Sequence, residues 1–220
     1  MDHNTLSKLY RTRFPDTALS RKNDIWRVIT GFFIQKFILP TDVVLDLASG
    51  YGEFINNIKA SRKIAIDLNP DAQKYVGDDV AFYQGNSIEI VQALPCSPNV
   101  MFASNFLEHL PDKPTLNLLL SGIYQTLAPG GKFIILGPNL RYLPGKYWDF
   151  YDHSLGLTHS SLCEALELAG FGIEKCIDKF LPYTTKTAMP THPILVRWYL
   201  KIPLAWRILG KQFFIIASKP

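Results

Sequence analysis

Long apolar runs are missing from this sequence. Hydrophobic residues make up 47% of its 220 positions, yet no apolar run reaches the roughly 18 residues that a membrane span needs. The most apolar stretch, residues 28–39, is interrupted by Gln35 and Lys36. Residues 1–20 carry charges throughout and contain no apolar segment typical of a secretory signal. We therefore expect neither a membrane-spanning helix nor a signal peptide.

Cysteine is scarce, and charge of one sign has only a small excess. The three cysteines, Cys96, Cys163 and Cys176, form no Cys-x-x-Cys pair and leave one thiol unmatched. This count argues against a disulfide scaffold or a zinc knuckle and favours the reducing cytoplasm. The net charge of +4, from 23 basic and 19 acidic residues, is too small to indicate a nucleic-acid partner.

What the sequence does contain is an alternation of short apolar runs and helical patterns. We expect strands at residues 43–47, 63–66, 80–83, 100–104, 133–136, 171–177 and 213–217. A helix is expected from Asn23 or Asp24 to just before Pro40, and further helices at residues 53–60, 71–75, 115–127 and 160–168. Strands that alternate with helices predict an α/β fold with a doubly wound, mostly parallel sheet and helices on both faces. Residues 182–210 contain four prolines and are interpreted as an insertion.

The most informative segment is residues 43–54, Val-Val-Leu-Asp-Leu-Ala-Ser-Gly-Tyr-Gly-Glu-Phe. It has the pattern of a strand, a turn of small residues and the start of a helix. Small residues let the backbone approach a ligand closely, and the first turn of a helix has free N–H groups. The pattern alone suits a nucleotide cofactor, a dinucleotide cofactor or merely a tight turn.

Polar residues follow the next predicted strands. Asp67 ends the second strand, 21 positions after Asp46, and its carboxylate could accept hydrogen bonds from both hydroxyls of a ribose. Asn86 and Ser87 follow the third strand and could contact the edge of an adenine. The fourth strand is followed by residues 104–112, Ser-Asn-Phe-Leu-Glu-His-Leu-Pro-Asp, and the fifth is preceded by a Pro-Gly-Gly turn.

This series of motifs resembles the class I S-adenosylmethionine-dependent methyltransferases that act on small molecules. The resemblance covers about residues 41–180. It implies a Rossmann-like sheet of seven strands with a reversed last strand, and S-adenosylmethionine as cofactor. Residues 137–153 also resemble uncharacterised bacterial methyltransferases of polysaccharide gene clusters. That likeness implies a small-molecule acceptor, namely a hydroxyl of a sugar or of a lipid-linked glycan.

The resemblance also implies a cofactor site. The residues expected around the methionine and ribose portions are Asp46, Ala48, Ser49, Gly50, Gly52 and Asp67. Those expected around the adenine and the sulfonium are Leu68, Asn86, Ser87, Asn105 and Phe106. The family turn has a glycine where this chain has Ala48, and close approach of the backbone survives there if the φ angle of Ala48 is negative.

Two other functions remain open at this point. A nicotinamide-dependent oxidoreductase shares the strand-turn-helix pattern, but its third glycine would fall at Ile55, a bulky residue. A non-catalytic subunit that binds S-adenosylmethionine is the other alternative, because Ala48 departs from the family turn.

Transfer of a methyl group to a hydroxyl requires a base that removes the proton. The candidate catalytic residues are His109, Asp152 and His153. His109 alternatively pins the start of the following helix, and Asp152 and His153 alternatively brace their loop. Glu108 and His109 raise the question of a metal, but Asn105 stands where a further carboxylate would be needed, and two ligands do not make a site. No metal is therefore expected.

Two segments lie outside the predicted core. Residues 1–39 are expected to form an N-terminal helical lid, and residues 40–220 the methyltransferase core. In the lid, Tyr10, Arg11, Arg13 and Arg21 either contact the carboxylate of the cofactor or belong to a solvated basic tail. Residues 193–209 mix aliphatic, tryptophan and basic residues. They suit a cap on the acceptor pocket, a peripheral membrane contact or a homodimer interface.

Overall fold

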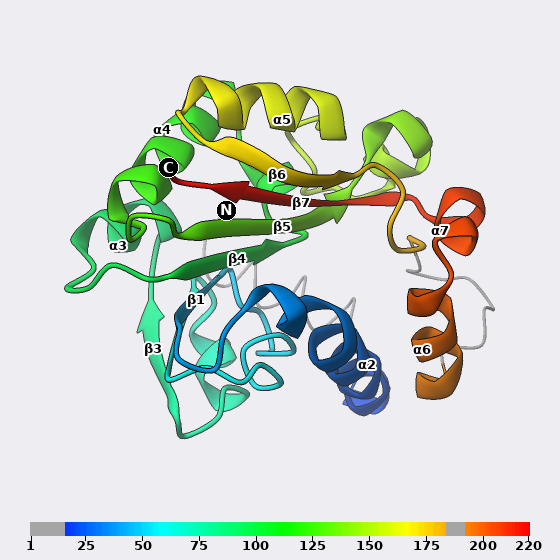
Figure 1. The fold of residues 1–220 in the computed structure, drawn as a ribbon, viewed down its shortest axis with the longest axis horizontal. Helices are drawn as coiled ribbons and strands as arrows, with labels where there is room; N and C mark the ends of the chain where they lie inside the picture. The colour runs from blue at the N-terminus through cyan, green and yellow to red at the C-terminus, as the bar shows by residue number, and fades with distance from the viewer. Residues whose placement is uncertain (1–15, 184–191) are drawn as a thin grey trace.

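The computed structural model describes residues 16–183 and 192–220, and it contains one seven-stranded sheet with helices on both faces (Figure 1). The strands are β1 (Val43–Leu47), β2 (Arg62–Asp67), β3 (Val80–Gln84), β4 (Val100–Ser104), β5 (Lys132–Pro138), β6 (Gly172–Ile177) and β7 (Gln212–Ser218). They lie in the order β3-β2-β1-β4-β5-β7-β6. Among these seven strands only β7 runs antiparallel to its neighbours, which are β5 and β6. The predicted fold class, including the reversed last strand, is confirmed.

The strand order reverses between β1 and β4, which are parallel neighbours in the middle of the sheet. From β1 the chain proceeds outward to β2 and β3, then returns to β4 and continues outward to β5. Ligands of open α/β sheets bind beside the carboxyl ends of the strands at such a reversal. The fold therefore directs attention to the segments that follow β1, β2, β3, β4 and β5.

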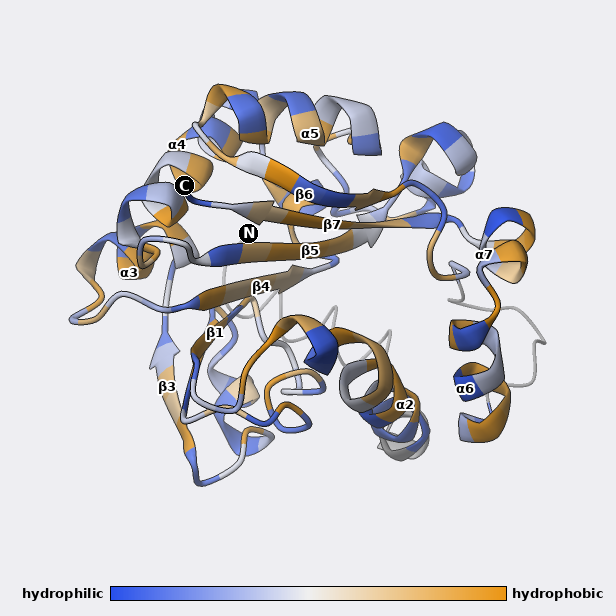
Figure 2. Cartoon of the chain, viewed as in Figure 1, coloured by the Kyte–Doolittle hydropathy of each residue, from blue (hydrophilic) through white to orange (hydrophobic). Residues whose placement is uncertain are grey.

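Helices cover the sheet on both sides. They are α2 (Asp16–Val28), α3 (Ser87–Ala93), α4 (Lys113–Thr126), α5 (His159–Leu168), α6 (Pro193–Lys201) and α7 (Pro203–Leu209). On one face α4 and α5 bury leucines such as Leu119, Leu120 and Leu162 against the strands. On the other face the chain after α2 buries Phe33 and Ile34. Figure 2 shows this arrangement as apolar helix faces turned toward the apolar strands.

The first helix differs from the single helix expected up to Pro40. The α-helix ends at Val28 and is followed by a π-helical turn, Ile29–Phe33, and a 3₁₀ turn, Ile34–Phe37. Gly31 and the β-branched residues at positions 29 and 30 are weak helix formers, so the α-helical geometry is easily lost there. The altered turns bury Ile29, Phe33 and Ile34 in the core.

The helix predicted at residues 53–60 is wrong. Residues 51–57 form a succession of turns, and residues 58–60 are irregular. The Nδ2 atom of Asn57 donates to the carbonyl oxygen of Glu53 over 2.8 Å, which is the oxygen that the Asn57 N–H would use in an α-helix. The Asn56 side chain donates to the carbonyl oxygen of Tyr75, 2.7 Å away, while its backbone N–H still makes a helix-like bond to the Gly52 carbonyl oxygen over 3.0 Å. The Asn57 side chain thus takes the place of one helical hydrogen bond after β1.

Some elements were not predicted or were predicted differently. Helix α3 was missed, although Asn86 caps it by accepting a hydrogen bond from the Ile88 N–H over 2.9 Å. Residues 71–75, expected to be helical, lie mostly in a 3₁₀ turn, Pro70–Lys74. The insertion at 182–210 contains α6 and α7. No helix in the described ranges is long and apolar enough to cross a membrane.

Candidate functional site

The turn after β1 has a left-handed backbone at three positions. Ala48 has a φ angle of +53°, Gly50 of +55° and Gly52 of +72°. The condition of a negative φ at Ala48 is therefore not met. A methyl side chain in this region crowds the backbone, whereas glycine adopts it freely. The backbone N–H of Ser49 donates to the carbonyl oxygen of Ile66 over 3.0 Å, so the turn is held against the end of β2.

We expect Ala48→Gly to stabilise the protein. Removing the strain of an alanine in the left-handed region stabilises the folded state by about 1–2 kcal/mol. The greater conformational freedom of glycine stabilises the unfolded state by about 0.4–1 kcal/mol and offsets part of this gain. The free energy of unfolding should therefore rise by about 0.5–1 kcal/mol, measurable by urea denaturation. Gly52→Ala is the opposite control, since its new Cβ would lie 2.8 Å from Asn56 Nδ2 at a positive φ. An equal loss of stability in both variants would contradict the strain at Ala48.

Three carboxyl groups converge beside this turn. Asp67, at the end of β2, accepts the Gly50 N–H and the Asn69 N–H, each over 2.7 Å. Burial raises the pKa of Asp67 to about 6, and the charge of Glu53 adds to that rise. Burial also holds the pKa of Asp46 well above its usual range, reinforced by Glu53 and Asp67. The site therefore concentrates negative charge, which a bound cation would stabilise.

The turn also contains a polar group that a ligand could satisfy. The Oγ atom of Ser49 is buried and has no hydrogen-bond partner among residues 16–183 and 192–220. A buried hydroxyl without a partner costs free energy unless a ligand or water completes it. Together with the carboxyl groups of Asp46 and Asp67, it suits a ligand that carries a positive charge and hydroxyl groups.

The residues expected around the adenine and the sulfonium follow β2, β3 and β4. Leu68 is exposed directly after β2, while Asn86 and Ser87 begin α3 after β3. Asn105 is exposed, has a φ angle of +48°, and donates from Nδ2 to Ser104 Oγ over 3.0 Å. Phe106 is half-buried against the leucine-rich core. Because β1 to β4 are parallel, these residues lie at the same edge of the sheet as the turn after β1.

The three candidate catalytic residues come together after β4 and β5, at the same edge of the sheet. His109 lies in the short turn Leu107–His109 after β4, and Asp152 and His153 lie in the loop after β5. The Nδ1 atom of His109 is 3.0 Å from the carbonyl oxygen of Asp152 and 3.3 Å from its Oδ2. Both oxygens accept hydrogen bonds, so Nδ1 carries the hydrogen and the neutral ring has its lone pair on Nε2. The following helix, α4, is capped by Asp112.

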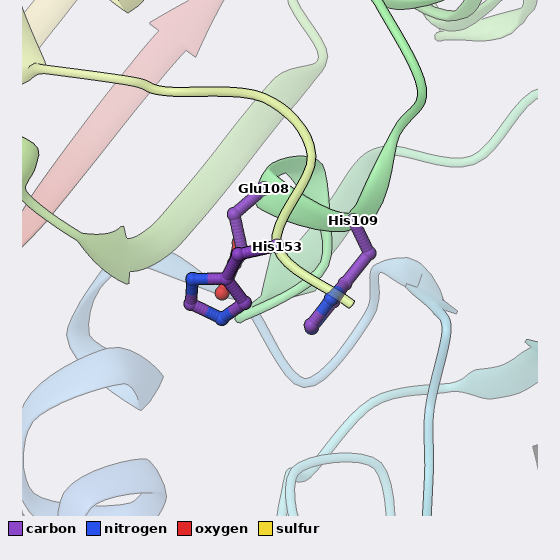
Figure 3. Close-up of side chains that lie close together, drawn as sticks. All are labelled: Glu108, His109 and His153. Atoms are coloured by element: carbon purple, nitrogen blue, oxygen red, sulfur yellow. The ribbon is translucent and has the colours of Figure 1, made fainter. Parts of the chain in front are cut away.

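Glu108 lies next to His109 and His153 (Figure 3). Glu108 is 3% exposed, and burial raises the pKa of its carboxyl group to about 7. The rings of His109 and His153 lie 5.0 Å apart. Glu108, His109 and His153 each offer one ligand atom, and these atoms lie within 4.8 Å of one another. The sequence suggested only two ligands here, and the third comes from the loop after β5.

The comparisons with known proteins decide the family. Residues 13–175 match the profile of a family described as a methyltransferase domain. The chain belongs to that family. No curated protein sequence matches it significantly. The predicted identity is therefore confirmed: the protein is an enzyme, a class I methyltransferase that uses S-adenosylmethionine.

Solved structures show the same fold at low sequence identity. An S-adenosylmethionine-dependent methyltransferase from Archaeoglobus fulgidus is 22% identical, with a TM-score of 0.65 and coverage of 99% of this chain and 100% of that one. One from Mesorhizobium loti is 17% identical, with a TM-score of 0.59 and coverage of 84% and 95%. The N-methyltransferase NodS from Bradyrhizobium japonicum is 11% identical, with a TM-score of 0.59 and coverage of 92% and 96%. The methyltransferase thus spans nearly the full length of these structures.

Proposed function

We propose that the methyltransferase holds S-adenosylmethionine along the turn after β1, between Asp46 and Asp67. The observation that supports this placement is the buried Ser49 hydroxyl, which has no hydrogen-bond partner in the described part of the chain, in the same turn region as Asp46 and Asp67, whose pKa values are raised. Asp67 would accept the ribose hydroxyls, since its carboxylate keeps lone pairs beyond the two that accept Gly50 and Asn69. Asp46 would face the ammonium group of the methionine portion. Leu68, Asn86 and Ser87 would then border the adenine.

The remaining cofactor contacts would come from the segment after β4. Asn105 and Phe106 lie between the turn after β1 and the cluster of His109, so they would line the pocket under the sulfonium. The bound cofactor supplies a methyl group on a positively charged sulfur, which leaves as a neutral thioether. The protein contributes alignment, because well-oriented reactants gain effective concentrations of about 10⁵ M and above.

The proposed acceptor is a hydroxyl of a small molecule, either a sugar or a lipid-linked glycan. Its support is the arrangement of His109, Asp152 and His153 beside Glu108. His109 is oriented by Asp152 and keeps a lone pair on Nε2, the requirement for a group that takes up a hydroxyl proton. The side chain of His109 is 29% exposed, so an acceptor can reach it.

The acceptor is identified by transfer of labelled methyl groups from S-adenosylmethionine to nucleotide-linked and lipid-linked sugars. The proposal expects a labelled ether, which survives mild base, unlike a methyl ester. Label found on amino groups alone would contradict the hydroxyl acceptor while leaving the methyltransferase activity intact.

The N-terminal segment is proposed to act as a lid over the cofactor. Lys22 of α2 forms an ion pair with Glu53 over 2.7 Å, and Asn57 Nδ2 donates to Asn23 Oδ1 over 2.9 Å. Both contacts join α2 to the turns after β1, where the cofactor is placed. Arg21 is exposed, whereas Tyr10, Arg11 and Arg13 lie outside the described residues.

The insertion is proposed to contact an anionic membrane surface, which would suit a lipid-linked acceptor. Helices α6 and α7 bury Leu200 and half-bury Trp206 against the core. Their other side exposes large apolar residues, namely Ile194, Leu195, Trp198, Ile202, Leu204, Ile208 and Leu209. The exposed basic residues Arg197, Lys201 and Arg207 lie on the same helices. Apolar side chains flanked by cations match the boundary of an anionic bilayer.

Leu204→Asp is expected to abolish flotation with vesicles that contain phosphatidylglycerol. The substitution places a charge that anionic lipids repel at a position that is 66% exposed. Leu168→Asp, at an 84% exposed leucine of α5, is the matched control and should float like the unaltered protein. If the unaltered protein and the Leu168→Asp control both fail to float, and Leu204→Asp instead dissociates a dimer in sedimentation, the surface is a homodimer interface.

A further inference from the structure

We propose that Glu108, His109 and His153 bind one divalent cation of the zinc type on the acceptor side of the site. One ligand atom of each residue lies within 4.8 Å of the others. The inference rests on the proposed function and deepens it, because the cation would contact the acceptor hydroxyl. Figure 3 shows the three side chains close together, with the Glu108 side chain behind the His153 ring and the His109 ring next to them.

The set of ligands selects the class of ion. Imidazole suits Zn²⁺ and its transition-metal neighbours, whereas Mg²⁺ and Ca²⁺ prefer oxygen ligands. Two imidazoles and one carboxylate are three protein ligands of a tetrahedral ion, and the fourth position stays open for a substrate oxygen. Asn105, the position that argued against a metal from sequence, is not needed once His153 supplies the third ligand.

The geometry needs only a small adjustment. Ligand atoms about 2.1 Å from a tetrahedral ion lie about 3.4 Å apart, so the three atoms must approach one another by at most about 1.4 Å. The His153 ring stacks on the Phe150 ring, with 5.0 Å between the ring centroids, and meets the Tyr147 ring edge-on, with 4.9 Å between the centroids. These contacts limit the rotation of the His153 ring. The loop itself is tied to Glu108, whose carbonyl oxygen accepts the N–H groups of Ser154 and Leu155 over 3.0 Å each.

The groups around the ligands also fit a metal site. Metal-binding histidines usually donate their second ring N–H to a carboxylate or a carbonyl oxygen. Asp152 offers both to Nδ1 of His109, at 3.3 Å and 3.0 Å, which leaves Nε2 as the nitrogen available to a cation. Asp152 thereby acts as a positioning residue. The partly exposed His109 provides the entry path, because Glu108 and His153 are both buried.

A cation here would change how the acceptor loses its proton. A hydroxyl bound to a divalent cation is more acidic than a free one, so the proton can pass to solvent while the oxygen remains next to the methyl donor. His109 would then serve as a ligand, and Glu108 would supply the negative charge that neutralises part of the cation.

The test uses the full chain without a histidine tag, freed of metal by dialysis against a chelator. Zn²⁺ binding is measured by calorimetry, and Co²⁺ binding by its visible absorption. We expect one ion per chain and the absorption of tetrahedral Co²⁺ with nitrogen and oxygen ligands. His109→Ala and Glu108→Gln should each weaken Zn²⁺ binding by about 100-fold. Removing a residue that only hydrogen-bonds a metal ligand already weakens metal binding by about 10–100-fold, and these two residues are the proposed ligands themselves. His192→Ala, at an exposed histidine of the cap of α6, should bind like the unaltered protein.

The same samples separate failure of this inference from failure of the proposed function. Circular dichroism establishes that each variant is folded, and S-adenosylhomocysteine binding is measured alongside. A protein that transfers methyl groups to hydroxyls but binds no stoichiometric Zn²⁺ overturns the metal site alone. Zn²⁺ binding that is equal in His109→Ala, Glu108→Gln and His192→Ala also overturns it. Zn²⁺ bound as expected, without transfer to any hydroxyl, supports the site and overturns the proposed acceptor.

Discussion

Asp67→Asn is expected to weaken the binding of S-adenosylhomocysteine by about 100-fold or more. A hydrogen bond to a charged group contributes about 1.5–3 kcal/mol, and two ribose hydroxyls would lose such a bond, which corresponds to two orders of magnitude in affinity or more. The substitution also removes an acceptor from the Gly50 N–H, which the carboxylate holds at 2.7 Å. Calorimetric titration measures the loss directly.

The matched control is Asp79→Asn. Asp79 also lies in the sheet region, next to β3, and pairs with Lys63 over 2.6 Å, but it lies at the amino ends of the strands, away from the proposed cofactor. The affinity of the Asp79→Asn variant for S-adenosylhomocysteine should remain within about twofold of that of the unaltered protein. A similar loss in both variants would indicate general destabilisation and would contradict the role of Asp67.

The pH dependence of binding gives a second readout for Asp67. Its pKa is raised to about 6 in the free protein, and only the ionised carboxylate accepts from both hydroxyls. Affinity should be constant above about pH 7 and fall as the pH drops through 6, to about a tenth of its maximum at pH 5. Asp67→Asn should lack this step. A step that persists in the variant would assign it to another group.

His109→Ala is expected to lower the rate of methyl transfer by about 10²–10⁴-fold, the range that a positioned proton acceptor contributes. Its affinity for S-adenosylhomocysteine should stay within about twofold, because the cofactor is placed at the turn after β1. The measurement pairs single-turnover transfer of labelled methyl groups with calorimetry on the same protein. The expectation holds whether His109 takes the proton or binds the proposed cation.

His192→Ala is the control for His109→Ala, since it also removes an imidazole but from the surface of the insertion. It should transfer methyl groups at the rate of the unaltered protein. Unchanged turnover in His109→Ala would remove this residue from the mechanism. A loss of cofactor affinity equal to the loss of rate would place its effect in binding instead.

The central strands could be predicted closely from the sequence. The bounds of β1 and β4 agree with the expected residues 43–47 and 100–104, because each is a short apolar run buried on both faces. The alternation of strands and helices predicted a doubly wound sheet, but that the strand order reverses between β1 and β4 came from the structure. Asp67 could be noted as a ribose-binding candidate from its place at the end of the second predicted strand, whereas Asp46 was placed in the same site by the resemblance to the methyltransferases.

The turn after β1 was less predictable, because its conformation depends on contacts between segments distant in sequence. Asp67 accepts the Gly50 N–H, and the turn that it holds has a left-handed backbone at Ala48, a residue type that does not indicate this geometry. The missing helix at residues 53–60 has a local cause, since Asn57 takes the carbonyl oxygen that would continue it. Two adjacent asparagines were the available signal.

The cluster of Glu108, His109 and His153 shows what a sequence pattern leaves out. His109 and Asp152 are 43 positions apart, and nothing in the residues between them fixes how the loop after β5 folds back. The bonds from Ser154 and Leu155 to the Glu108 carbonyl oxygen bring it there. A third potential ligand was therefore visible only in the structure.

The most direct test of the account is calorimetric titration of the purified methyltransferase with S-adenosylhomocysteine, with NAD⁺ as the control. The account predicts one site per chain of micromolar affinity for S-adenosylhomocysteine and no heat from NAD⁺. Binding of NAD⁺ alone, or of neither ligand by a folded protein, would contradict a cofactor site built on Asp46, Ser49 and Asp67.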